Sequence, residues 1–134
     1  MFDGQDPLIA QPVAAVVDQA LVEKIWALIE ADPHTRIAYD TYGRSDGEPL
    51  LLLQGLGADG RGWIRQRRAM GERYRCIAVD NRGVGRSDVP EGPYDLEVMA
   101  HDAVAVLDDL GVDSAHVMGA SMGGIMSQIL GVRH

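Results

Sequence analysis

Residues 115–124 read Ala-His-Val-Met-Gly-Ala-Ser-Met-Gly-Gly, and they carry most of the information about fold class. The apolar run 115–118 is typical of a buried strand, and a helix is expected from about Ile125. Between them lies a G-x-S-x-G pattern centred on Ser121. A serine on such a sharp turn would stand above the edge of a sheet, and the flanking glycines remove side chains that would clash. The helix behind it would offer N–H groups and the positive end of its dipole to a developing negative charge.

Strands and helices are expected to alternate upstream of this stretch. The run Leu50-Leu51-Leu52-Leu53 is typical of a strand covered on both faces, as in a parallel sheet. Asp95 can cap a helix that Gly111 would end. This order predicts an α/β fold with a mostly parallel sheet and flanking helices. The expected strands are 36–42, 50–53, 75–80 and 115–118, and the expected helices are 63–70, 95–110 and 125–130.

Length and composition restrict the class of protein. The 134 residues suffice for one ordinary domain, and 46% hydrophobic with 24% charged residues is typical of a globular chain. The net charge of −8 argues against nucleic-acid binding, and the single cysteine, Cys76, excludes an intrachain disulfide. The sequence has neither the basic start of a secretory signal nor a membrane-spanning apolar run, so we expect a cytoplasmic protein without membrane contact. Residues 1–33 are interpreted as an extension of uncertain structure, in which 13–29 fits a helix although 25–30 could also be a strand, and residues 34–134 as the domain.

A second glycine pattern supports a different function. Gly55, Gly57 and Gly60 form a G-x-G-x-x-G between an expected strand and helix, and Asp80 ends the next strand. These features match the fingerprint of a dinucleotide-binding half-domain. Gly62 argues against it, because the helix would begin with poor helix formers instead of a firm N-terminus for a pyrophosphate. A non-catalytic α/β module is a further alternative.

A third pattern, residues 80–88, reads DNRGVGRSD. We interpret it as a loop that its own arginine and aspartate groups hold in place by charge-assisted hydrogen bonds. It would shape the surroundings of a site without taking part in the chemistry.

Together, residues 50–63, 80–90 and 119–124 resemble the first half of an α/β-hydrolase. They are similar to the small esterase, enol-lactonase and cofactor-free haloperoxidase branch, in which the same three motifs follow in this order. Gln54 departs from the pattern, since many members carry histidine before the glycine, but its replacement leaves the backbone donors available. The resemblance implies that Ser121 is the nucleophile and that the backbone N–H groups of Met122 and Leu56 form the oxyanion hole. It further implies hydrolysis of a small ester or lactone through an acyl-enzyme, with no cofactor and no metal.

The acid and base of the family's triad are not found where the resemblance places them, after the serine. No Asp or Glu follows Ser121, and His134 would lie roughly 20 Å away along a helix. We expect His34 in a turn, His101 solvated on its helix and His116 packed in the core. The chain is therefore expected to be truncated after the elbow helix and inactive alone, whether as part of a longer protein, as a partner of another chain, or as a degenerate product. Strand 115–118 would then be an exposed edge that invites self-association.

Overall fold

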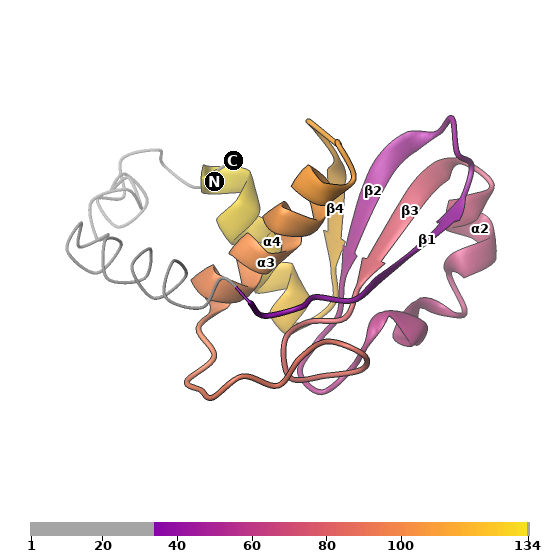
Figure 1. The fold of residues 1–134 in the computed structure, drawn as a ribbon. Coiled ribbons are helices and arrows are strands. Elements are labelled where there is room, and N and C mark those ends of the chain that lie inside the picture. Colours follow the sequence, from indigo (N-terminus) through magenta and orange to yellow (C-terminus); the bar gives the residue numbers. More distant parts are fainter. Residues whose placement is uncertain (1–33, 134) are drawn as a thin grey trace, which may run out of the picture. The chain divides into compact units, whose positions relative to one another are not determined.

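The computed structural model describes residues 34–133, which form a four-stranded sheet with helices on both faces (Figure 1). The strands are β1 (Tyr39–Gly43), β2 (Glu48–Leu53), β3 (Tyr74–Val79) and β4 (His116–Gly119), in the spatial order β1-β3-β2-β4. Strands β3, β2 and β4 are parallel, and β1 pairs antiparallel with β3. The expected α/β fold with a mostly parallel sheet is therefore confirmed.

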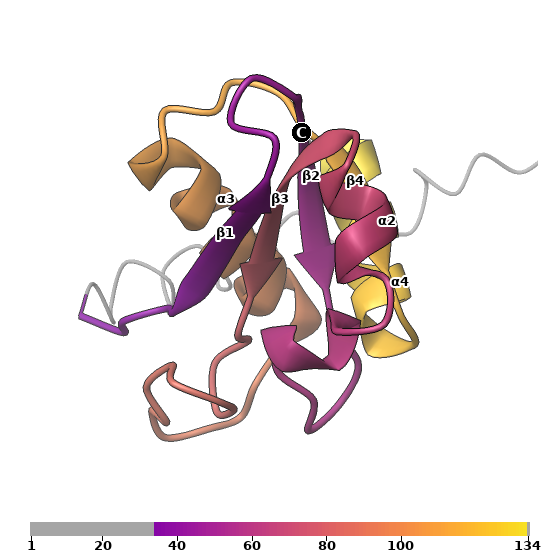
Figure 2. The same ribbon diagram turned by 90° about the vertical axis from the view of Figure 1, so that its right-hand side faces the viewer.

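Four helical segments connect and cover these strands. After β2 come the short 3-10 helix η2 (Gly60–Trp63) and α2 (Arg67–Gly71); α3 (Leu96–Asp109) lies between β3 and β4, and α4 (Met122–Arg133) follows β4. In Figures 1 and 2, α3 and α4 lie on one face of the sheet and α2 lies on the other. None of the helices within residues 34–133 is long and apolar enough to cross a bilayer.

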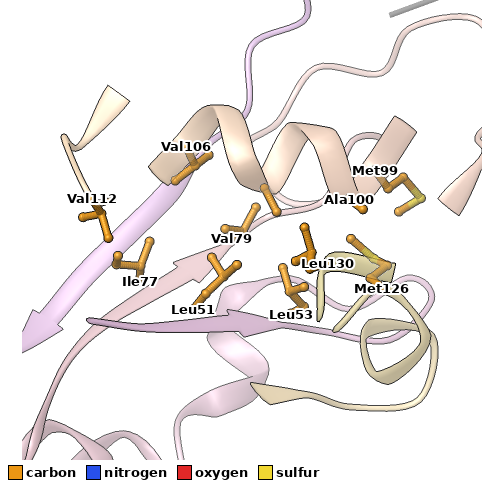
Figure 3. Close-up of a cluster of buried hydrophobic side chains, with 11 residues drawn as sticks. Leu51, Leu53, Ile77, Val79, Met99, Ala100, Val106, Val112, Met126 and Leu130 are labelled. Atoms are coloured by element: carbon orange, nitrogen blue, oxygen red, sulfur yellow. The ribbon is translucent and has the colours of Figure 1, made fainter. Parts of the chain in front are cut away.

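The central strands alternate their side chains between two cores. Leu51, Leu53, Ile77 and Val79 point toward α3 and α4, where they pack against Met126 and neighbouring apolar side chains (Figure 3). Leu50, Leu52, Cys76 and Ala78 form the second core with Trp63 on the opposite face. Successive residues of a strand face opposite sides, so an unbroken apolar run is what a doubly covered strand requires. Both cores hold β2 and β3 firmly, and the loops at the carboxyl ends of these strands carry the site described below.

Several boundaries differ from the expected ones. The helix expected over 63–70 is shorter and begins later: the 3-10 helix η2, capped by the Asp59 carboxylate, ends at Trp63, and the α-helix α2 covers only Arg67–Gly71. The first strand begins at Tyr39, three residues later than expected, since the backbone of Arg36 and Ala38 is bonded to the loop at 87–88. Helix α3 matches its expected range, with the Asp95 carboxylate accepting from the Glu97 N–H at 2.7 Å and Gly111 at φ +63°. The alternatives for 13–29 and the terminal His134 lie outside the described residues.

Two histidines also lie in surroundings that differ from those expected. His116 is not a core residue: its side chain is 60% exposed at the start of edge strand β4, with Nε2 3.3 Å from Glu48 Oε2. The expectation of a packed histidine failed because, in the part of the chain that the structure describes, β4 has a neighbouring strand on one side only. His101 is half-buried on α3 and has an interaction partner, so it is not simply solvated.

Candidate active site

Ser121 occupies a strained turn between β4 and α4. Its φ is +52°, and it is the sole non-glycine residue in the described part of the chain with a positive φ. A left-handed backbone costs an L-residue about 1–2 kcal/mol, so the surrounding structure must impose it. Backbone hydrogen bonds hold the turn; among them, the Ala120 N–H donates to the Leu53 carbonyl at 3.0 Å, and the Gly124 N–H donates to the Ser121 carbonyl at 2.8 Å. The sharp junction expected from the G-x-S-x-G pattern is confirmed.

The two glycines of the pattern are required by space. A Cβ added to Gly119 would collide with the backbone of Gly123, and one added to Gly123 would collide with the carbonyl of Leu53. The backbone between β4 and α4 therefore packs directly against backbone, close to the end of β2. Any side chain at either glycine would push the serine turn away from the sheet.

The loop after β2 reaches the serine from the neighbouring strand. A Cβ added to Gly55 would lie 3.2 Å from Ser121 Cβ and 3.7 Å from Ser121 Oγ, so the two segments are in direct contact. The loop then forms a β-turn in which the Ala58 N–H donates to the Gly55 carbonyl at 3.2 Å. Gly57 has φ +72°, as the third position of a type II turn requires. Leu56 is the second residue of this turn, so the turn's hydrogen bond does not use its N–H.

Helix α4 begins beside this turn, and the N–H of its first residue, like that of Leu56, has no hydrogen-bond partner among the described residues. Met122 is the first residue of α4, where backbone N–H groups have no partner within the helix. The following groups are engaged, since the Gly123 N–H donates to the Ala120 carbonyl at 2.9 Å. Within residues 34–133, neither the Met122 nor the Leu56 N–H donates a hydrogen bond. The start of the helix, with its positive dipole end, is suited to bind negative charge.

Buried amides fix the first residue of the loop. The Asn81 side chain donates from Nδ2 to the Gln54 carbonyl at 3.3 Å, and the Gly55 N–H donates to Gln54 Oε1 at 3.3 Å. Gly62 gives the Gln54 amide its space, because a Cβ there would lie 2.5 Å from Nε2. The residue that replaces the family's histidine thus fills the space beneath the loop. The sequence interpretation missed Asn81; the only signal was an amide directly after a buried strand.

Asp80 holds the loops after β2 and β3 together. Its side chain is buried and accepts from the Gly60 N–H at 2.9 Å, the Arg86 N–H at 3.0 Å and Arg86 Nε at 3.1 Å. Hydrogen bonds with Asp40 and Asp80 raise the pKa of the Arg86 guanidinium. The dinucleotide hypothesis is not supported, because Gly60 opens a 3-10 helix of four residues and the Asp80 carboxylate is occupied and cannot bind a ribose.

The loop at 80–88 is held by ion pairs, as its sequence predicted. Arg82 Nε lies 2.6 Å from Asp102 Oδ2 on α3, and both side chains are nearly buried, at 10% and 13% exposure. Arg36 and Asp88 pair at the far end of the loop. A buried pair of this kind fixes the position of the loop relative to α3.

His116 and His34 do not lie where a base for Ser121 is expected. His116 lies at the amino end of β4, whereas Ser121 follows its carboxyl end, so about 15 Å of extended chain separates them. His34 lies at the exposed beginning of the described chain. Among the described residues, the Ser121 hydroxyl has no hydrogen-bond partner, and no three His, Cys, Asp or Glu side chains cluster as a metal site would require.

Comparison with known families agrees with this geometry. Residues 48–134 match the family described as the alpha/beta hydrolase fold, and the chain belongs to this family. It is 39% identical over 102 residues to the RutD protein of Caulobacter segnis, whose name provisionally describes a carbamate hydrolase. It is 35% identical over 94 residues to 3-oxoadipate enol-lactonase 2 of Acinetobacter baylyi. These alignments cover 73% and 70% of this chain but 38% and 35% of the relatives, so the chain spans little more than a third of their length.

Solved structures give the same result. The enol-lactonase from Burkholderia xenovorans superposes with a TM-score of 0.74 at 32% identity, covering 76% of this chain and 40% of that one. Est816, described as an N-acyl homoserine lactone degrading enzyme, superposes with a TM-score of 0.71 at 37% identity, covering 76% and 39%. The resemblance expected from the three motifs is therefore confirmed at the level of the family.

Proposed function

We propose that this chain carries the nucleophile and the oxyanion hole of a serine hydrolase that cleaves a small carboxylic ester or lactone. The observation that carries the proposal is Ser121 itself, held at φ +52° at the start of α4 with Gly55 packed against it. Nothing in the packing of two cores needs a strained serine at this point, whereas a nucleophile presented above the sheet does. The relatives named for lactone hydrolysis support the choice of substrate class.

The proposed reaction is acyl transfer. Ser121 Oγ attacks the substrate carbonyl and gives up its proton to a base, and the carbonyl oxygen becomes an oxyanion. The N–H groups of Leu56 and Met122 donate to this oxyanion, the alcohol leaves, and water then cleaves the acyl-enzyme. Removing one such donor typically raises the barrier by about 3–4 kcal/mol. Asn81, Gln54 and Asp80 would keep the donors in place.

We also propose that the 134-residue chain alone is not a competent enzyme. The position of His116 supports this, because it lies at the amino end of β4 whereas Ser121 follows the carboxyl end. The base and its carboxylate would come from elsewhere, in a longer polypeptide or another chain. Without a base the hydroxyl remains neutral and weakly nucleophilic. Three further points remain predictions: a cytoplasmic location, the absence of nucleic-acid and membrane partners, and the division of the chain at residue 34.

The test is hydrolysis of p-nitrophenyl butyrate by the active protein that contains this chain, with Ser121→Ala and the exposed Ser114→Ala as a matched pair. Ser121→Ala should lower kcat by about 10⁴–10⁶-fold while Ser114→Ala leaves it unchanged. Unchanged turnover in Ser121→Ala would refute the nucleophile and favour a non-catalytic module. Ordinary turnover by the monomeric 134-residue chain, lost in Ser121→Ala, would instead show that the chain completes its own site.

A further inference from the structure

A cavity of about 320 Å³ lies beside the proposed oxyanion hole. Gly55, Leu56 and Met122 line one side of it, so the wall includes both residues whose N–H groups are proposed to hold the oxyanion. Gly55 is also the residue in contact with Ser121. The cavity is therefore continuous with the place where the substrate carbonyl would sit.

Much of the remaining lining is apolar. It is formed by Val84 from the loop after β3, by Tyr94, and by Leu96 and Met99 at the start of α3. The Tyr94 hydroxyl is already engaged, since it donates to the Pro90 carbonyl at 2.7 Å. The Tyr94 ring lies against Gly83, where an added Cβ would collide with it, so this wall depends on a glycine.

The polar side chains that line the cavity already form hydrogen bonds or ion pairs within the protein. Arg82 is paired with Asp102 at 2.6 and 2.8 Å, and the Asn81 amide donates to the Gln54 carbonyl. A charged group of a ligand would therefore lose its water here without gaining a partner, which is costly. The volume is at the lower end of the range of about 300–1,000 Å³ usual for ligand sites. Both properties favour a short, uncharged chain.

We infer that this cavity binds the acyl chain of the substrate, and that the chain is a short aliphatic one. This inference rests on the proposed function and specifies its substrate. When a carbonyl oxygen lies between the N–H groups of Leu56 and Met122, the acyl chain extends from the same carbon. The cavity adjoining those two residues is then the space that the chain enters, while the leaving alcohol departs on another side.

Binding can be measured without catalysis by NMR of methionine methyl groups. Of the six methionines in the sequence, Met99 and Met122 line the cavity, whereas Met70 packs on the opposite face of the sheet and Met126 is in the core. In a titration with acetamide, butanamide and hexanamide, the methyl signals of Met99 and Met122 should shift. Affinity should rise by about fourfold per methylene group, from the free energy of burying each one. Adipic acid monoamide, whose distal carboxylate would be buried unpaired, should bind at least tenfold more weakly than hexanamide.

A matched pair of variants locates the effect. Val84→Phe should fill the cavity and weaken hexanamide binding at least tenfold, whereas Val89→Phe, 75% exposed on the same loop, should leave it unchanged. If Val84→Phe fails to fold, Val84→Ala enlarges the cavity and should extend the preference to octanamide. Equal shifts at Met70 and Met126, no dependence on chain length, or an unaffected Val84 variant would overturn the inference. Ser121→Ala should bind hexanamide as the parent chain does. Amide binding therefore tests the cavity, and ester turnover by Ser121→Ala tests the nucleophile, so the two hypotheses can fail separately.

Discussion

Asn81 and Gln54 are joined by a buried hydrogen bond, 3.3 Å from the Asn81 side-chain nitrogen to the Gln54 backbone carbonyl. Each residue follows the end of a parallel strand, β3 and β2 respectively, so the bond ties two neighbouring loops at the carboxyl edge of the sheet. Gln54 directly precedes Gly55 and Leu56. The side chain of one loop therefore sets the direction in which the next loop presents its N–H groups.

Replacing Asn81 by leucine should destabilise the protein. Leucine has a similar volume but leaves the buried Gln54 carbonyl without its donor, which costs about 1–3 kcal/mol. Urea denaturation at constant m-value measures the loss. Gln66→Leu is the matched control, because Gln66 is an exposed amide that makes no capping hydrogen bond. Equal stability losses in the two variants would show that the Asn81 bond contributes nothing.

The neighbouring glycines at the start of α4 should respond oppositely to alanine. In Gly123→Ala the new Cβ would collide with the Leu53 carbonyl, so the variant should lose several kcal/mol or fail to fold. In Gly124→Ala the nearest atom is the Gly119 carbonyl oxygen at 3.6 Å, an ordinary contact. Because alanine favours a helix over glycine, this second variant should gain about 0.5–1 kcal/mol. Thermal unfolding of the pair is the measurement, and similar melting temperatures would contradict the backbone packing described here.

Asp59 should titrate below the ordinary aspartate pKa. The Arg61 guanidinium donates to its carboxylate at 2.6 Å and lowers the pKa of Asp59 from its ordinary value of 3.8. Since the folded pKa is depressed, the contribution to stability is complete above the ordinary value and is lost as the pH falls through the folded one. Carboxyl ¹³C NMR from pH 5 to 1.5 measures the titration. Arg61→Gln should move the Asp59 midpoint upward, and Arg65→Gln, an exposed arginine of the same segment, should not.

The edge of β4 should make the chain associate with itself. Among residues 34–133, strand β4 pairs with β2 on one side only, and Val117 and Met118 are 36% and 43% exposed. Unpaired strand edges with apolar side chains invite pairing with another chain. Light scattering across a concentration series should show a mass above 14.5 kDa that falls in Val117→Lys but not in Val89→Lys. A concentration-independent monomer would be evidence against association through this edge.

Much of the fold was predictable because its signals are local. The range of α3 follows from apolar residues at helical spacing between Asp95, whose side chain caps the first turn, and Gly111, which adopts the positive φ that ends it. The turn at Ser121 follows from two glycines spaced to let backbone meet backbone. The caps of α3 and the close approach of Gly119 to Gly123 join groups within a few residues of one another, so the local sequence contains these determinants. The contacts of the same turn with Leu53 join groups far apart in the chain and depend on the pairing of β2 with β4.

The remaining features depended on segments far apart in the chain. Asn81 reaches Gln54, and Asp80 reaches Gly60, only because parallel pairing of β2 with β3 brings the ends of the two strands to one edge of the sheet. His116 was expected in the core because an apolar strand is usually covered, yet strand order left it exposed beside Glu48. The local sequence pattern indicates which side chains are apolar. Whether a side chain is buried depends on the segments that pack against it, and for an edge strand the tertiary structure determines those segments.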